Sequence, residues 1–155
     1  MQSNIDGKAA SSKETFRLET AVTINMHAKP ERVWVILTNA QDTTKWNSTL
    51  ISVSGTFALG ETISFVTKAV PNRTFKTKVT EFAPPSKLVV SDGNFIFKGV
   101  RTYILTPKPD GTTDFSMQEI FTGLMLPLIK RSLPNFEPIF EQYASDLKAE
   151  AEKAN

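Results

Sequence analysis

The sequence predicts an α+β fold in which a curved antiparallel sheet of seven strands is covered by one long C-terminal helix. Between positions 50 and 121, strand-like segments follow one another closely and are joined by turn residues. One strand pattern and two short helical patterns precede them, and a helical stripe of apolar residues ends the chain. Because a single helix is too narrow to fill the bend of such a sheet, we expect a cavity between the two.

The first part of the chain divides into a tail, a strand and two short helices. Residues 1–13 are small and polar, which predicts a flexible tail, and residues 14–155 are expected to form one domain. From Phe16 to Ile24 the side chains alternate as in a half-buried strand. Pro30 is a favourable first residue for a short helix that ends near Leu37. A second short helix is predicted over residues 39–47.

Six further strands are predicted from the alternation of side chains between turn signals. Their expected bounds are Leu50–Ser54, Thr62–Val70, Arg73–Phe82, Lys87–Asp92, Phe95–Pro107 and Thr112–Phe121. Consecutive strands with short connections form an antiparallel meander.

The last two strands form a hairpin whose register follows from its turn. A three-residue turn, Pro109-Asp110-Gly111, places Arg101 opposite Glu119 and Tyr103 opposite Met117, all on one face. Taking charges out of water costs several kcal/mol per ion, so a packed apolar core has little use for such a pair. A cavity that holds a ligand or water accommodates it.

The C-terminal segment predicts a helix that starts after an interruption. The apolar stripe comprises Ile129, Leu133, Phe136, Phe140, Tyr143 and Leu147. Because proline lacks an amide hydrogen and disfavours helical geometry in the residue before it, Pro134 predicts a break at Leu133. Asn135 is the expected N-cap of a helix from Phe136 to about Lys153, and Leu126–Ser132 a separate turn.

Composition excludes several function classes. The chain has 155 residues, no cysteine, one histidine and a net charge of +2. Disulfides and thiolate chemistry are therefore excluded, a metal or other cofactor is not expected, and nucleic acid is not an expected partner. No apolar run approaches the length of a membrane span and the first residues do not resemble a secretory signal, so we expect a cytoplasmic protein without integral membrane association. The oligomeric state stays open.

Several segments, taken in order, resemble the helix-grip superfamily, which includes START-related lipid-transfer domains, plant pathogenesis-related proteins and polyketide cyclases/dehydratases. The segments are Lys29–Trp34, Thr44–Asn47, Phe97–Arg101, Glu119–Leu124 and Leu128–Leu133, and together they resemble the bacterial polyketide-cyclase-like branch. The resemblance covers nearly everything from Phe16 to Lys153. It implies a helix-grip fold with a ligand cavity beneath the C-terminal helix.

Arg101 and Glu119 are the strongest candidate site residues. They form either a structural cross-strand ion pair or the polar end of a ligand pocket, with Arg101 meeting an acidic group of the ligand. The expected lining of the pocket is Phe65, Thr67, Phe75, Val79, Val90, Arg101, Tyr103, Met117, Glu119, Phe136 and Phe140. Further polar candidates on or near the inner face are Asn47, Thr67, Thr77 and Asp92.

These observations favour a protein that binds or carries a small hydrophobic molecule with one polar end, such as a lipid, a polyketide or another aromatic compound. Two alternatives remain. One is an enzyme of the polyketide cyclase/dehydratase kind with Arg101 and Glu119 as acid–base groups. The other is a protein-interaction module like the co-chaperone members of the superfamily. The apolar segment Gly123–Leu128 is expected to form the rim or lid of the cavity, with a membrane or partner contact as the alternative.

Overall fold

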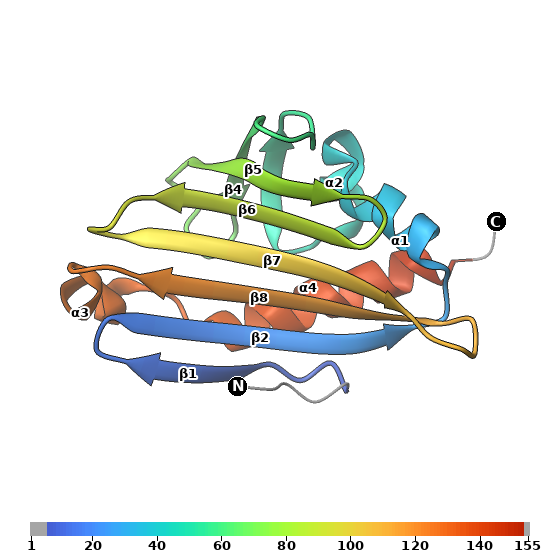
Figure 1. The fold of residues 1–155 in the computed structure, drawn as a ribbon. Coiled ribbons are helices and arrows are strands. Elements are labelled where there is room, and N and C mark those ends of the chain that lie inside the picture. Colours follow the sequence, from blue (N-terminus) through green and yellow to red (C-terminus); the bar gives the residue numbers. More distant parts are fainter. Residues whose placement is uncertain (1–5, 154–155) are drawn as a thin grey trace.

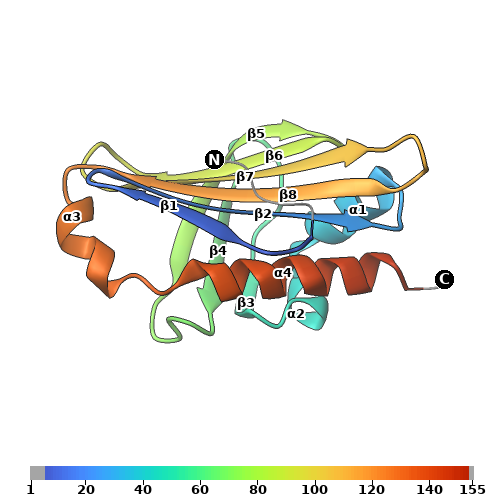
Figure 2. The same cartoon turned by 90° about the horizontal axis from the view of Figure 1, so that it is seen from below.

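The computed structural model describes residues 6–153 and shows an eight-stranded antiparallel sheet with a long helix against its concave face (Figures 1 and 2). The strands lie in the order β1-β2-β8-β7-β6-β5-β4-β3. Their bounds are β1 Ala10–Glu14, β2 Arg17–Met26, β3 Leu50–Ser54, β4 Thr62–Thr67, β5 Phe75–Ala83, β6 Lys87–Gly93, β7 Lys98–Pro107 and β8 Thr113–Thr122. The helices are α1 Pro30–Leu37, α2 Thr43–Trp46, α3 Leu126–Ile129 and α4 Phe136–Ala151, with short 3-10 turns at Ala40–Asp42 and Lys130–Ser132.

The eighth strand corrects the prediction of seven strands and of a flexible tail through residue 13. β1 pairs with β2 along the edge of the sheet, and Ser11 lies 3.1 Å from Thr20 between the two hydroxyl oxygens. Main-chain hydrogen bonds to an exposed strand edge need no apolar side chains, so the small polar residues of β1 gave no strand pattern. Residues 1–5 of the predicted tail lie outside the described residues.

The other predicted elements are confirmed, with ends that shift by a few residues. α1 has the predicted bounds, and the second helical segment divides into the 3-10 turn and α2. The predicted break in the C-terminal segment is present, since Leu133 is extended with ψ of 143°. α4 then starts at Phe136, and the Asn135 side chain accepts a hydrogen bond from the Glu137 amide at 3.2 Å, as an N-cap does.

The hairpin of β7 and β8 has the predicted register, with Arg101 opposite Glu119, Tyr103 opposite Met117 and Leu105 opposite Phe115. This register continues across β2, where Thr20 pairs with Glu119 and Val22 with Met117. Successive rows of side chains on the concave face therefore cross four or more strands.

The apolar core lies between this face and α4. Its fully buried side chains include Phe115 and Met117 from the sheet and Phe140 and Leu147 from α4. In Figure 2, β3 and β4 bend down beside α4, so that the sheet partly encloses the helix. Within residues 6–153, none of the helices has the length and apolar character needed to cross a bilayer.

Candidate ligand-binding site

Arg101 and Glu119 form an ion pair on the concave face of the sheet. The Arg101 Nε donates to the Glu119 Oε2 at 3.2 Å. The two side chains keep 22% and 13% of their accessible area, although both lie in the middle of their strands on the side that faces α4. Water therefore still reaches this pair, although it lies on the face that the helix covers.

The helix contributes an aromatic surface to the same place. The guanidinium carbon of Arg101 lies 5.0 Å from the ring centroid of Phe140, within the range of a cation–π interaction. Tyr103 and Tyr143 lie beside the pair with their rings 6.1 Å apart. Arg101 thus has a carboxylate on one side and aromatic side chains on the other.

The surroundings change the proton affinities of the pair in the same direction. Burial works against the charged guanidinium, but the Glu119 carboxylate and the Tyr103 hydroxyl outweigh it and raise the pKa of Arg101. Burial also raises the pKa of Glu119, and nearby Asp92 adds to this, while Arg101 offsets only part of it. Arg101 is therefore a permanent cation, and Glu119 holds a proton more strongly than an ordinary glutamate.

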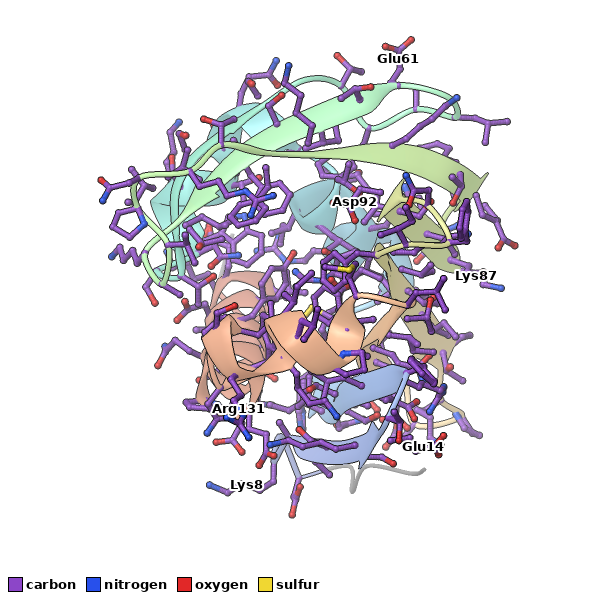
Figure 3. The ribbon with its side chains drawn as sticks, turned by 90° about the vertical axis from the view of Figure 1, so that its left-hand side faces the viewer. Lys8, Glu14, Glu61, Lys87, Asp92 and Arg131 are labelled. Atoms are coloured by element: carbon purple, nitrogen blue, oxygen red, sulfur yellow. The ribbon has the colours of Figure 1, made fainter. Side chains whose placement is uncertain are left out.

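Asp92 at the end of β6 adds a second acid to this end of the concave face. Figure 3 shows it near the centre of the molecule's end, between the strands of the upper part and the helices below. Gly99 on β7 leaves room for it, because a Cβ there would lie 3.0 Å from the Asp92 Oδ1 and 3.1 Å from Phe121. Partial desolvation raises the pKa of Asp92, although Arg73 and Arg101 act in the opposite direction.

Aromatic rings surround these charged groups on both sides. On one side, Phe65 and Phe75 stack at 5.5 Å, and the Arg73 guanidinium lies 4.8 Å from the Phe75 centroid. On the other, neighbouring rings lie 5.3–6.3 Å apart along the series Phe97, Phe121, Phe136 and Phe140. We call this set of aromatic and charged side chains the aromatic cluster: Phe65, Arg73, Phe75, Asp92, Phe97, Arg101, Glu119, Phe121, Phe136 and Phe140.

The residues predicted to line the pocket divide into two groups by burial. Val79, Met117 and Phe140 have at most 1% exposure and belong to the packed core, and Val90 and Tyr103 follow with 7% each. The partly exposed group comprises Phe65, Thr67, Phe75, Arg101, Glu119 and Phe136. Thr67 uses its hydroxyl to accept from the Val70 amide at 3.1 Å, so it stabilises the turn after β4.

Several members of the aromatic cluster were not among the predicted site residues. Phe121 shares the face of Glu119 two positions away, and Phe97 stands in the same relation to Gly99 and Arg101, so the period of two carried the signal for both. No sequence pattern pointed to Arg73, which precedes β5 in a turn. Among the described residues, Trp46 Nε1 and Asn47 Nδ2 are buried side-chain donors without a hydrogen-bond partner, and the Trp46 ring contacts Tyr143 edge-on at 5.6 Å.

Two other features lie apart from this site. A surface hollow is lined by residues of the α1 start, the β5–β6 turn and the β7–β8 turn: Lys29, Pro30, Glu31, Pro85, Ser86, Pro107, Lys108, Gly111 and Thr112. These turns are at the opposite end of the sheet from Phe97 and Phe121. Across residues 6–153, histidine and acidic side chains form no cluster of three that could hold a metal ion.

A curved antiparallel sheet that partly encloses a long C-terminal helix defines the helix-grip class of ligand-binding domains, as the sequence resemblance implied. The profile of the polyketide cyclase / dehydrase and lipid transport family matches residues 15–152. The chain belongs to this family. A comparison with curated proteins gives no match.

Solved structures support the fold. A truncated norcoclaurine synthase from Thalictrum flavum superposes with a TM-score of 0.65 at 10% identity, covering 94% of this chain and all of the other. CalU16 from Micromonospora echinospora gives 0.60 at 15% identity, with 92% and 87% covered. A conserved protein of unknown function from Enterococcus faecalis, EF2215, gives 0.65 at 16% identity, with 96% and 83% covered. At these identities the likeness concerns the fold alone.

Proposed function

We propose that the protein binds a small hydrophobic molecule with an acidic end on the concave face of the sheet, beneath α4. Arg101 is the anchor for the acidic group, and the phenylalanines of the aromatic cluster provide the apolar walls. Small-molecule sites usually combine apolar walls with a few convergent polar groups, which is the composition found here.

The position of Arg101 is the observation that carries this proposal. Its cation lies on the inner face and is partly open to water, and among residues 6–153 it has one carboxylate partner, Glu119, at 3.2 Å. A guanidinium has five N–H donors in a planar fork, so donors remain for a ligand carboxylate or phenolate.

The proposed route to the site passes between the half-buried side chains of the aromatic cluster. Phe136 is the first residue of α4 and follows the extended Leu133–Asn135 segment. It therefore lies at the end of the helix and not within its hydrogen-bonded middle. Phe65 and Phe75 are half-buried on the opposite side. We infer that a ligand enters between these side chains and displaces Phe136 from its contact with Phe121.

Displacement of an environment-sensitive dye tests the proposal. Fatty acids, flavonoids and aromatic polyketides, each with and without an acidic group, are titrated against the dye-loaded protein. Acidic apolar ligands are expected to displace the dye in the micromolar range, and Arg101→Ala should weaken them about tenfold or more, because a charge-assisted hydrogen bond is lost. Neutral analogues should change little.

Lys76→Ala is the matched control, since Lys76 is an exposed cation on β5 that is not part of the aromatic cluster. It should leave every affinity unchanged. The proposal fails if no ligand displaces the dye. It also fails if Arg101→Ala weakens acidic and neutral ligands equally, or if Lys76→Ala weakens acidic ligands as much as Arg101→Ala does.

A second candidate function is an enzyme of the cyclase/dehydratase kind, and the proton affinity of Glu119 favours it. A carboxyl with a raised pKa beside Arg101 and two tyrosines is suited to general acid–base catalysis. Glu119→Gln separates the two functions. An enzyme should lose turnover with little change in KM, whereas a carrier should keep its ligand affinity and show no turnover in either form.

A further inference from the structure

One end of the molecule carries most of its exposed apolar side chains. Among the described residues, six of the ten large exposed apolar side chains lie there, with exposures from 38% to 77%: Phe16, Phe95, Ile96, Leu124, Met125 and Leu128. We call these six the apolar tip. Contiguous exposed apolar patches on a protein of this size mark interaction sites more often than chance exposure.

The tip is built from three turns that hold one another. The Leu124 amide donates to the Phe95 carbonyl at 3.3 Å and the Met125 amide to the Ile96 carbonyl at 2.9 Å, which ties the β8–α3 turn to the β6–β7 loop. The register of β2 and β8 pairs Arg17 with Thr122, so the β1–β2 turn with Phe16 lies beside them. In Figure 1 all three turns meet at the left-hand end of the sheet.

Basic side chains accompany the tip. Lys13, Lys98 and Arg131 are exposed within three residues of tip positions, and Lys130 is half-buried. The Lys130 Nζ donates to the Glu14 carbonyl at 3.0 Å, which joins the segment after α3 to the β1–β2 turn. Apart from Glu19, which pairs with Arg17, the acidic residues within the same distance are Glu14 and Asp92. Figure 3 shows Glu14 and Arg131 on opposite sides of this end. The charge around the tip is therefore positive.

We propose that the apolar tip docks the protein on an anionic lipid surface. Apolar side chains on projecting turns enter the boundary between headgroups and acyl chains, and lysine and arginine nearby are attracted to anionic headgroups. The six residues come from three connected segments: the β1–β2 turn, the β6–β7 loop and the β8–α3 segment. The tip also adjoins Phe97 and Phe121 of the aromatic cluster. A docked protein therefore presents the proposed ligand entrance to the lipid.

Vesicle sedimentation with the ligand-free protein tests the docking separately from ligand binding. Vesicles of phosphatidylcholine alone are compared with vesicles of equal parts phosphatidylcholine and phosphatidylglycerol. The wild type should bind the anionic vesicles and lose this binding as salt is added. Phe95→Ser with Leu128→Glu, both at strongly exposed positions, should weaken it roughly tenfold or more. Lys130→Glu with Arg131→Glu should do the same on anionic vesicles.

Leu59→Glu is the control, since Leu59 is 67% exposed in the β3–β4 loop away from the tip. It should bind as the wild type does, and all variants should keep the wild-type melting temperature. The proposal is overturned if the wild type does not bind anionic vesicles, or if Leu59→Glu weakens binding as much as the tip variants. A concentration-dependent dimer that Leu128→Glu abolishes, with no vesicle binding, also overturns it and assigns the tip to a second copy of the chain.

Discussion

Arg101 of β7 holds its guanidinium 5.0 Å from the ring centroid of Phe140 on α4, while its Nε bonds Glu119 on the neighbouring strand. This one side chain therefore connects the sheet, the helix and the acidic group of the site. Phe140 is fully buried, whereas Arg101 keeps contact with water. The fully buried core and the water-accessible side chains of the concave face therefore meet at these two residues.

Phe140→Ala should destabilise the protein by about 3–5 kcal/mol, because it removes a fully buried ring and leaves a cavity under the sheet. Chemical denaturation measures this difference in unfolding free energy. Val35→Ala, at an exposed position of α1, should change stability by less than about 0.5 kcal/mol. A small effect at Phe140 would show that α4 does not hold the sheet in the manner described.

The Arg101–Glu119 pair should be costly to break and inexpensive to replace. Arg101→Met or Glu119→Leu alone leaves an unpaired charge in a mostly desolvated place, and each should cost about 1–3 kcal/mol, less than for a fully buried pair because water reaches both groups. The double variant should cost less than either single change. Unfolding free energies of the four proteins give the coupling, and additive costs would contradict a direct interaction.

Stability should fall as the pH rises from the ordinary carboxyl pKa of about 4 towards neutral, because of Asp92 and Glu119. Both have pKa values raised in the native state. The unfolded chain releases these protons near the ordinary values, while the native state keeps them to higher pH, so native stability is lost over the interval between the two. Asp110 and Glu152, whose pKa values are lowered, complete their opposite contribution below this window.

Melting temperatures across this pH range measure the effect. Asp92→Asn should reduce the slope, since it removes one of the two groups and the repulsion that it exerts on Glu119. Ser54→Ala, at an exposed position on β3 without a charge, should leave the slope unchanged. A wild-type melting temperature that rises over this range would contradict the raised pKa values.

The sequence predicted the parts of the fold whose determinants are local. The turn Pro109–Gly111 set the hairpin register by its length, and with it the pairing of Arg101 and Glu119. Pro134 and Asn135 set the break and the start of α4 in the same way. β1 was missed because its pairing depends on the free edge of β2, a property of the assembled sheet and not of the Ala10–Glu14 side chains.

The candidate site was predictable only in part, for a related reason. Alternation identifies inward-facing residues such as Val79, Met117 and Phe65 but does not distinguish those in the closed core from those beside open space. That difference depends on where α4 lies over the curved sheet. Arg73 and Asp92 lie at neighbouring ends of the paired strands β5 and β6, and Arg73 precedes the first residue of β5, so alternation does not assign it to a face.

NMR mapping of a bound ligand tests the central claim most directly. An acidic apolar molecule selected in the dye titration is added to labelled protein, and changes in backbone and side-chain signals are followed. The account predicts the largest changes at Arg101, Phe75 and Phe136. It is contradicted if the changes instead concentrate at Lys29 and Lys108, beside the surface hollow at the other end of the sheet.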